Sequence, residues 1–138
     1  MFQILDNLYQ GPKPSRQLPD QIKAVVNLMQ ECQADNKNLM PNDLAAYVHL
    51  PILDGPYPGM DWLKMAVAIV ESMMDKYPVY IHCRAGISRS SMLTAAVVMK
   101  KMGWRDHHKT LNFIAEKNKS IDPAPNFIKI LKEFEREF

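Results

Sequence analysis

Residues 79–103 constrain the fold of this chain more than any other segment. The first five, VYIHC, are mostly β-branched and aromatic, which is typical of a buried strand. The stretch SSMLTAAVVMKKMG at 90–103 is apolar on nearly every side, which predicts a central helix with Gly103 as its left-handed cap. Only a short loop separates the two. A strand that passes directly into a buried helix favours an α/β fold.

Strand and helix patterns alternate along the rest of the chain. Strands are expected from a mixed apolar and aromatic stretch and from two short apolar runs, at 3–11, 24–29 and 47–53. Helices are expected from apolar periodicity and capping residues, with a short one near Pro41 and Asp43 and longer ones at 60–76, 106–117 and 126–138.

The length of 138 residues and the even composition favour one domain with one core. The alternation predicts a single α/β domain whose central, mostly parallel, twisted sheet of four to five strands is flanked by helices on both faces. Ligands of such sheets bind beyond the carboxyl ends of the strands. Both HC at 82–83 and the turn-rich LPILDGPYPG at 50–59 are expected at such ends.

Composition and charge narrow the class of protein. The net charge of +2 and the scattered lysines give no support to nucleic-acid binding. Asp6 interrupts the apolar start of the chain, so no signal peptide is expected, and the longest apolar runs fall well below the roughly 18 residues that a membrane span requires. Cys32 and Cys83 are too few for a disulfide framework. We therefore expect a cytoplasmic protein in which any special cysteine has a chemical role.

The loop sequence HCRAGISRS at 82–90 indicates a site for an anion. A strand that turns through a short loop into a helix points several backbone N–H groups into one concavity, and the helix N-terminus adds partial positive charge. Gly86 allows a positive φ, and Arg89 can bind a tetrahedral dianion with two hydrogen bonds. Cys83 is expected at the floor, where these charges stabilise a thiolate. A thiolate beside a phosphate predicts phosphoryl transfer through a cysteinyl-phosphate.

The same nine residues match every fixed position of the signature H-C-x-x-G-x-x-R-S/T and resemble the protein tyrosine phosphatase superfamily. AGISRS is similar to the dual-specificity branch, which implies that 1–138 is a dual-specificity phosphatase catalytic domain with that family's fold. The resemblance implies that Cys83 is the nucleophile, that Arg89 binds phosphate and that Ser90 helps the thiolate to leave, while His82 holds the loop in shape. It implies phosphate contacts, largely through backbone N–H groups, from Arg84, Ala85, Gly86, Ile87, Ser88 and Arg89.

Two aspartates are candidates for the general acid that must protonate the leaving oxygen when no metal takes part. Asp54 follows the strand expected at 47–53, and its P-I-x-D context is similar to the acid loop of the family. Asp61 lies near the start of the helix at 60–76, where a role as a capping residue readily explains it. We favour Asp54. Because an aspartic acid is mostly ionised at neutral pH, we expect an activity optimum on the acid side.

The sequence thus predicts a phosphatase of phosphotyrosine and phosphoserine or phosphothreonine in proteins, without metal or cofactor. His107 and His108 are adjacent and cannot share a helix face as metal ligands do, and His49 stands alone. The short chain implies a shallow pocket. Arg84 at its rim is either a solvated residue or a site for acidic peptides, phosphoinositides or RNA 5′-phosphates, and a phosphoinositide or RNA end is the alternative substrate.

Two functions of other classes use a similar loop. An inactive phosphate-binding module is expected to lose the cysteine, the arginine or the acid, whereas this chain has all three. A rhodanese-type sulfurtransferase also uses a cysteine in an anion-binding loop but has no use for Asp54. A disulfide between Cys32 and an oxidised Cys83 is a further hypothesis, because thiols held as thiolates are readily oxidised.

Overall fold

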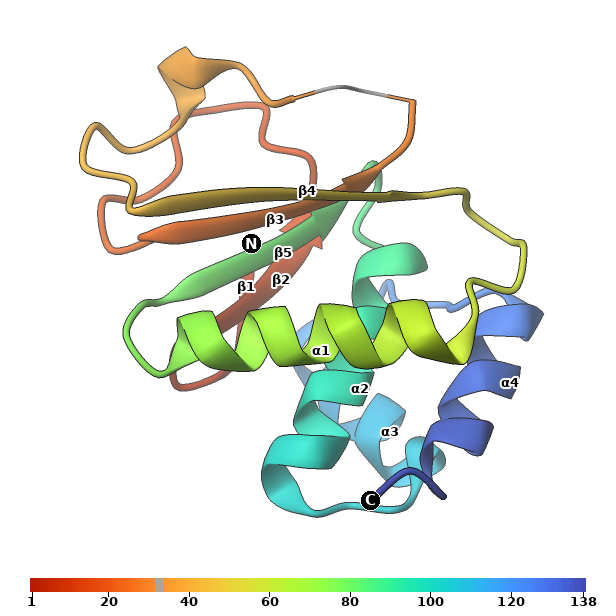
Figure 1. Ribbon diagram of the computed structural model, residues 1–138. Helices are drawn as coiled ribbons and strands as arrows, with labels where there is room; N and C mark the ends of the chain where they lie inside the picture. Colours follow the sequence, from red (N-terminus) through yellow and green to blue (C-terminus); the bar gives the residue numbers. More distant parts are fainter. Residues whose placement is uncertain (32–33) are drawn as a thin grey trace.

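The computed structural model describes residues 1–31 and 34–138 and consists of five strands, a 3-10 helix and four α-helices (Figure 1). In chain order they are β1 Phe2–Leu5, β2 Leu8–Pro12, β3 Ala24–Met29, η1 Lys37–Leu39, β4 Ala46–Ile52, α1 Met60–Met74, β5 Val79–Cys83, α2 Arg89–Met102, α3 His107–Lys117 and α4 Pro125–Phe134. None of the helices in the described ranges is long and apolar enough to cross a lipid bilayer.

The five strands form one sheet in the order β1-β2-β5-β3-β4. Only β1 runs antiparallel to its neighbour, so the expectation of one mostly parallel sheet is confirmed. The expected strand at 79–83 is β5, which pairs with β2 on one side and β3 on the other. Cys83, its last residue, therefore lies at the carboxyl edge in the middle of the sheet, where ligands of such folds bind.

One face of the sheet is covered by all four α-helices (Figure 1). The helix predicted from the apolar stretch at 90–103 is α2, and its residues from Arg89 to Met99 are all buried. It lies at the centre of the helical layer, in contact with the other three helices and with β2 and β5. Gly103 ends it with a φ of 69°, as expected. The all-round apolar pattern thus marks the helix with neighbours on every side.

The other face is covered differently from the expectation of helices on both faces. Within the described residues it carries no α-helix but a smaller apolar cluster formed by Leu18, Ile22, Val25, Met40 and Tyr80, with η1 and the segment 13–23 above it. The expected short helix near Pro41 and Asp43 is wrong, because the chain makes a turn there and Asp43 pairs with Lys23 at 2.5 Å. Prolines in these segments remove the hydrogen-bond donors that an α-helix needs.

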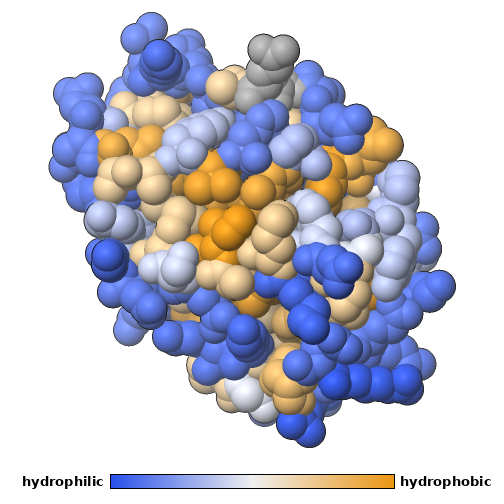
Figure 2. Space-filling model, viewed as in Figure 1, coloured by the Kyte–Doolittle hydropathy of each residue, from blue (hydrophilic) through white to orange (hydrophobic). Residues whose placement is uncertain are grey.

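The apolar core reaches the surface beside the edge strand β4. The residues of β4 are only half-buried except near its end, and half-buried side chains of both β4 and α1, such as Leu50 and Trp62, pack against the buried core. Figure 2 shows apolar atoms in the middle of this view, in the region where Figure 1 draws β4 above α1. The strand β4 is one of the two edges of the sheet, and β3 lies between it and β5.

Substitutions at two glycines with positive φ distinguish the cost of backbone strain from the cost of a steric clash. A Cβ atom at Gly86 would lie 2.5 Å from backbone atoms of Gly11 and Pro12, whereas one at Gly103 would meet nothing within 4 Å. We expect Gly103→Ala to lower the free energy of unfolding by about 1 kcal/mol through strain alone, and Gly86→Ala by roughly 3 kcal/mol because β2 must also move. Thermal or urea unfolding measures both, and equal losses would contradict the close approach of the loop to β2.

Candidate active site

The loop between β5 and α2 forms a cradle with unused hydrogen-bond donors. Four of its five carbonyl groups accept hydrogen bonds from the protein, those of Arg84, Gly86, Ile87 and Ser88 from Lys13 N, Gln10 Nε2, Asp122 N and Met92 N. The backbone N–H groups of residues 84–88 donate to no group in the described part of the chain. Gly86, at φ 71°, makes this turn possible. The loop therefore has five unused N–H donors, whereas most of its carbonyl acceptors are already occupied by the protein.

Cys83 and Ser90 lie at the base of this cradle. Cys83 is 3% exposed and its Sγ lies 3.2 Å from Ser90 Oγ and 3.5 Å from the Ser90 backbone nitrogen. Ser90 is fully buried in the first turn of α2. The sulfur thus has two possible donors from the start of a helix, the end that favours negative charge.

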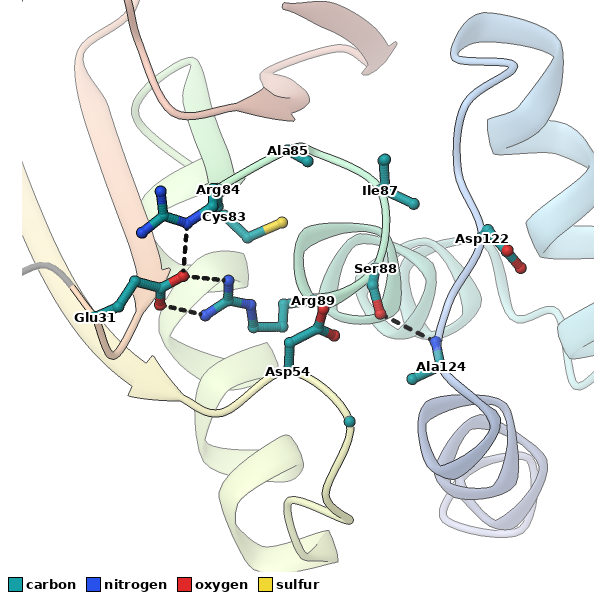
Figure 3. A pocket seen from close by; sticks show the side chains of 11 residues that line it. Glu31, Asp54, Cys83, Arg84, Ala85, Ile87, Ser88, Arg89, Asp122 and Ala124 are labelled. Atoms are coloured by element: carbon teal, nitrogen blue, oxygen red, sulfur yellow. Dashed lines mark hydrogen bonds and ion pairs between the residues drawn. The ribbon is translucent and has the colours of Figure 1, made fainter.

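Arg89 is held by Glu31, a residue that the sequence analysis did not identify. The two terminal nitrogens of Arg89 donate to Glu31 Oε1 and Oε2 at 2.8 and 2.9 Å, and Nη1 also reaches the carbonyl of Ile52 at 3.1 Å (Figure 3). The hydrogen bond from Arg89 holds the pKa of Glu31 well below its usual value, and the same bond raises the pKa of Arg89. Both groups therefore stay charged.

One nitrogen of this guanidinium remains unused. The Arg89 side chain is only 6% exposed, yet its Nε has no hydrogen-bond partner among residues 1–31 and 34–138. A buried N–H without an acceptor costs free energy, so such a group in a native fold needs an explanation. Here Arg89 lines the same pocket as Cys83, so its Nε is a donor beside the cavity that an anion can use.

Arg84 is largely exposed, with 65% of its side chain accessible, but it is not a free charge. Its Nε donates to Glu31 Oε2 at 3.1 Å (Figure 3). The sequence analysis left it either as a solvated residue or as a site for acidic substrates. The structure adds a third feature, since one carboxylate bridges Arg84 and Arg89 and offsets part of the charge of both.

His82 is anchored by a second acidic residue that the sequence analysis missed. It is fully buried, and its Nε2 lies 2.6 Å from Asp35 Oδ2, which also accepts from the hydroxyl of Tyr47 at 2.8 Å. Burial pushes the pKa of Asp35 upward, but the hydrogen bonds and charge of its partners outweigh burial and leave that pKa lowered. Asp35 therefore remains a carboxylate that fixes the ring beside Cys83.

The cradle opens into a pocket of about 460 Å³ that brings together most of the predicted residues (Figure 3). It is lined by Glu31, Asp54, Gly55, Cys83, Arg84, Ala85, Ile87, Ser88, Arg89, Asp122 and Ala124. Asp54 comes from the loop after β4, whereas Asp61 lies in the first turn of α1 and is not part of this lining. Gly59, not an aspartate, occupies the N-cap of α1. Of the two candidate acids, only Asp54 faces the cavity that holds Cys83.

Other predicted groups lie apart from the pocket. His107 binds Glu135 through Nδ1 at 2.6 Å, and His49 contacts the carbonyl of Met29. In the described ranges, no three residues among His, Cys, Asp and Glu form a group that could hold a metal ion. Cys32 lies outside the described residues, so its pairing with Cys83 stays a hypothesis.

Comparisons with known proteins agree with the signature in the loop. The family model described as the dual specificity phosphatase catalytic domain matches residues 8–137. Dual specificity protein phosphatase 8 from Homo sapiens is 33% identical over 78 residues, which cover 56% of this chain but only 12% of that protein. The chain thus spans a small part of the length of this relative.

Two solved structures show how widely the fold is shared. Human DUSP28 superposes with a TM-score of 0.85 at 17% identity, with 99% of this chain and 96% of that chain covered. PTPMT1 in complex with PI(5)P superposes with a TM-score of 0.72 at 23% identity, with 84% and 78% covered. At these identities the likeness concerns the fold alone.

The pair of Glu31 and Arg89 makes stability depend on pH. Because the pKa of Glu31 is lower in the folded chain than its usual value near 4.3, its contribution is complete above about pH 5 and is lost as the pH falls further. Glu31→Gln should melt on the order of a few degrees below the unchanged chain at pH 7, and this gap should narrow between pH 5 and pH 2. Calorimetry across that range would show a constant gap if the pair were not ionic.

Proposed function

The chain belongs to the dual specificity phosphatase family, and from this we propose that it is a metal-independent phosphatase that hydrolyses phosphotyrosine and phosphoserine or phosphothreonine in proteins. The observation that carries the proposal is the position of Cys83 Sγ at the base of the pocket, among N–H groups of 84–88 that have no acceptor in the described chain and beside the unpartnered Nε of Arg89. A nucleophile and an oxyanion site coincide there.

In the first step the Cys83 thiolate attacks the phosphorus atom. The N–H groups of residues 84–88 and Arg89 Nε bind the phosphate oxygens, and their fixed directions stabilise the charge that spreads over these oxygens in the transition state. The bond between phosphorus and the substrate oxygen breaks. Asp54, at the pocket wall, gives its proton to that oxygen, so an alcohol or phenol leaves instead of its anion.

In the second step water hydrolyses the cysteinyl-phosphate. The Asp54 carboxylate takes a proton from the water as its oxygen bonds to phosphorus. The sulfur–phosphorus bond breaks, its electron pair remains on Cys83, and the hydroxyl of Ser90 at 3.2 Å stabilises the returning thiolate. His82, anchored on Asp35, has no proton to transfer in this scheme and supports the loop.

The charges around the pocket support a protein substrate. Glu31 and Asp122 add negative charge to its lining, and Glu31 offsets part of the positive charge of Arg84 and Arg89. A polyphosphorylated lipid headgroup or a nucleic-acid end brings further phosphates to this rim and is repelled. A phosphoinositide remains the second candidate, supported by the shared fold of PTPMT1, which has been solved with PI(5)P.

We further propose that residues 1–138 act together as the catalytic domain and that this domain works in the cytoplasm. The family model covers all but the first seven residues and the last residue. The mechanism needs Cys83 as a free thiol, which is how the structure has it, and the cytoplasm keeps thiols reduced.

Two substitutions test the nucleophile and the acid. Cys83→Ser should lower turnover of an aryl phosphate by roughly 10⁴-fold or more, and Asp54→Asn by about 10²-fold. Because the acid step consumes a proton carried by Asp54, kcat should be highest on the acid side and fall as the pH rises, and this fall should vanish in Asp54→Asn. Asp61→Asn is the matched control and should keep the profile of the unchanged enzyme. Loss of the fall in Asp61→Asn instead would transfer the role to that residue.

A substrate panel tests the proposed class. We expect kcat/KM for phosphopeptides to exceed that for vesicles containing PI(5)P and for RNA bearing a 5′-phosphate by roughly tenfold or more. Each assay is run beside Cys83→Ser. Any turnover measured with that variant comes from a contaminating phosphatase and is subtracted. A preference for the lipid would favour the second candidate, and thiosulfate-to-cyanide sulfur transfer without phosphatase activity would contradict the proposal.

A further inference from the structure

A buried amide network connects the end of α3 to the base of the pocket. Gln10 on β2 is fully buried, and its Nε2 lies 2.7 Å from the carbonyl oxygen of Gly86 and 2.8 Å from Ser90 Oγ. Its Oε1 accepts from Asn118 Nδ2 at 3.0 Å. Asn118 directly follows α3 and is 3% exposed. None of these contacts is used in the mechanism above.

Backbone groups fix which way both amides point. The N–H of Ser120 can only donate, and it lies 3.1 Å from Asn118 Oδ1, so the Nδ2 of Asn118 must face Gln10. The carbonyl of Gly86 can only accept, so the atom of Gln10 beside it must be the nitrogen. Both orientations follow from groups with a single possible role. Gln10 Nε2 is therefore the donor to Ser90 Oγ.

This donor determines where the Ser90 hydroxyl hydrogen goes. A helical serine commonly donates to the carbonyl four residues earlier, as Ser91 does to Ile87 O at 2.8 Å. For Ser90 that carbonyl belongs to Gly86, and it already accepts from Gln10 at 2.7 Å and faces Asn118 Nδ2 at 3.4 Å. With both lone pairs of Gly86 occupied, the remaining acceptor is Cys83 Sγ at 3.2 Å.

We propose that Gln10, oriented by Asn118, is a positioning residue that directs the hydroxyl hydrogen of Ser90 onto the sulfur of Cys83. The hydrogen bond is present in the free protein, and its role in turnover rests on the proposed function. When water displaces the sulfur from phosphorus, the electron pair that returns to sulfur meets a donor already aimed at it. Ser90 keeps its proton, and Asp54 takes the proton of the water.

The test replaces Gln10 by methionine, which preserves length but removes both donors. The freed Gly86 carbonyl then captures the Ser90 hydroxyl at the usual helical position, and the sulfur loses its donor. We expect breakdown of the cysteinyl-phosphate to slow by about tenfold. Stopped-flow assays with p-nitrophenyl phosphate should show a larger burst of nitrophenol before a slower steady rate. The ratio kcat/KM, which reports only the steps up to formation of the cysteinyl-phosphate, should change little, because the donors of residues 84–88 remain.

Alkylation of Cys83 by iodoacetamide gives a second readout that needs no turnover. The midpoint of its pH dependence should move to higher pH in Gln10→Met, because the thiolate loses a hydrogen bond. Other titratable groups also interact with this sulfur, namely Arg89 and Tyr80 directly and Asp54 through Arg89. These groups are the same in both proteins, so they do not account for a difference in the midpoint. If the unchanged chain had no phosphatase activity, this measurement would still support or overturn the hydrogen-bond direction.

A double-mutant cycle with Ser90→Ala separates positioning from general loosening of the site. If Gln10 acts through Ser90, adding Gln10→Met to Ser90→Ala should change the breakdown rate by less than about twofold. The pH midpoint of alkylation should then be the same in Ser90→Ala and in the double variant. Effects that multiply, as expected of a merely structural role, would overturn the proposal. Thr94→Val is the matched control, since Thr94 lies one turn along α2, is fully buried and has a hydroxyl with no partner in the part of the chain that the structure describes. It should leave both readouts unchanged.

Asn118→Ser tests the network if Gln10→Met does not fold, which thermal melting determines first. This substitution removes the donor to Gln10 Oε1 but leaves Gln10 in place, so the amide loses its fixed orientation. We expect a shift of the alkylation midpoint in the same direction as for Gln10→Met, and smaller. A midpoint equal to that of the unchanged protein would overturn the assignment of Asn118 and Gln10.

Discussion

The site depends on the backbone polarity of one loop. Four of the five carbonyls of residues 84–88 accept hydrogen bonds from protein donors, while the N–H groups of the same residues have no acceptor in the described chain. This arrangement requires Gly86 at positive φ, so close to Gly11 and Pro12 that no Cβ fits. The strands β2 and β5 are paired along their whole length, from Leu8 opposite Val79 to Pro12 opposite Cys83, so the sheet holds the loop in place. The anion cradle is therefore a consequence of strand pairing, and flexible side chains only complete it.

The strand, the loop and the buried helix at 79–103 could be predicted because their signals are local. An apolar run, a glycine and an all-round apolar helix identify each element from its own residues. Asp54 was identified for a similar reason, since it follows a strand that ends at the same sheet edge. Asp61 shares its residue type but belongs to a helix turn outside the lining of the pocket.

Glu31, Asp35, Gln10 and Asn118 could not be predicted because their partners are distant in sequence. Gln10 and Asn118 are joined across 108 positions, and Glu31 reaches Arg89 across 58. Nothing in the local pattern distinguishes these polar residues from solvated ones. The covering of the second sheet face was misjudged for a related reason: alternation predicts helices, whereas Pro14, Pro19 and Pro41 lie in segments that cover the face as loops.

Ser90 and Ser91 show that residues distant in sequence determine which hydrogen bonds a side chain makes. They are adjacent in the same turn of α2 and are both buried, yet Ser91 donates to backbone carbonyls while the corresponding carbonyl for Ser90 is taken by Gln10. Neighbouring side chains determine the charge in the pocket in the same way. Glu31 offsets part of the charge of Arg84 and Arg89, so under the proposed function the phosphate is recognised mainly by the short-range N–H donors of the loop. A site built in this way selects by geometry, which favours one phosphate seated fully on the loop over several phosphates near its rim.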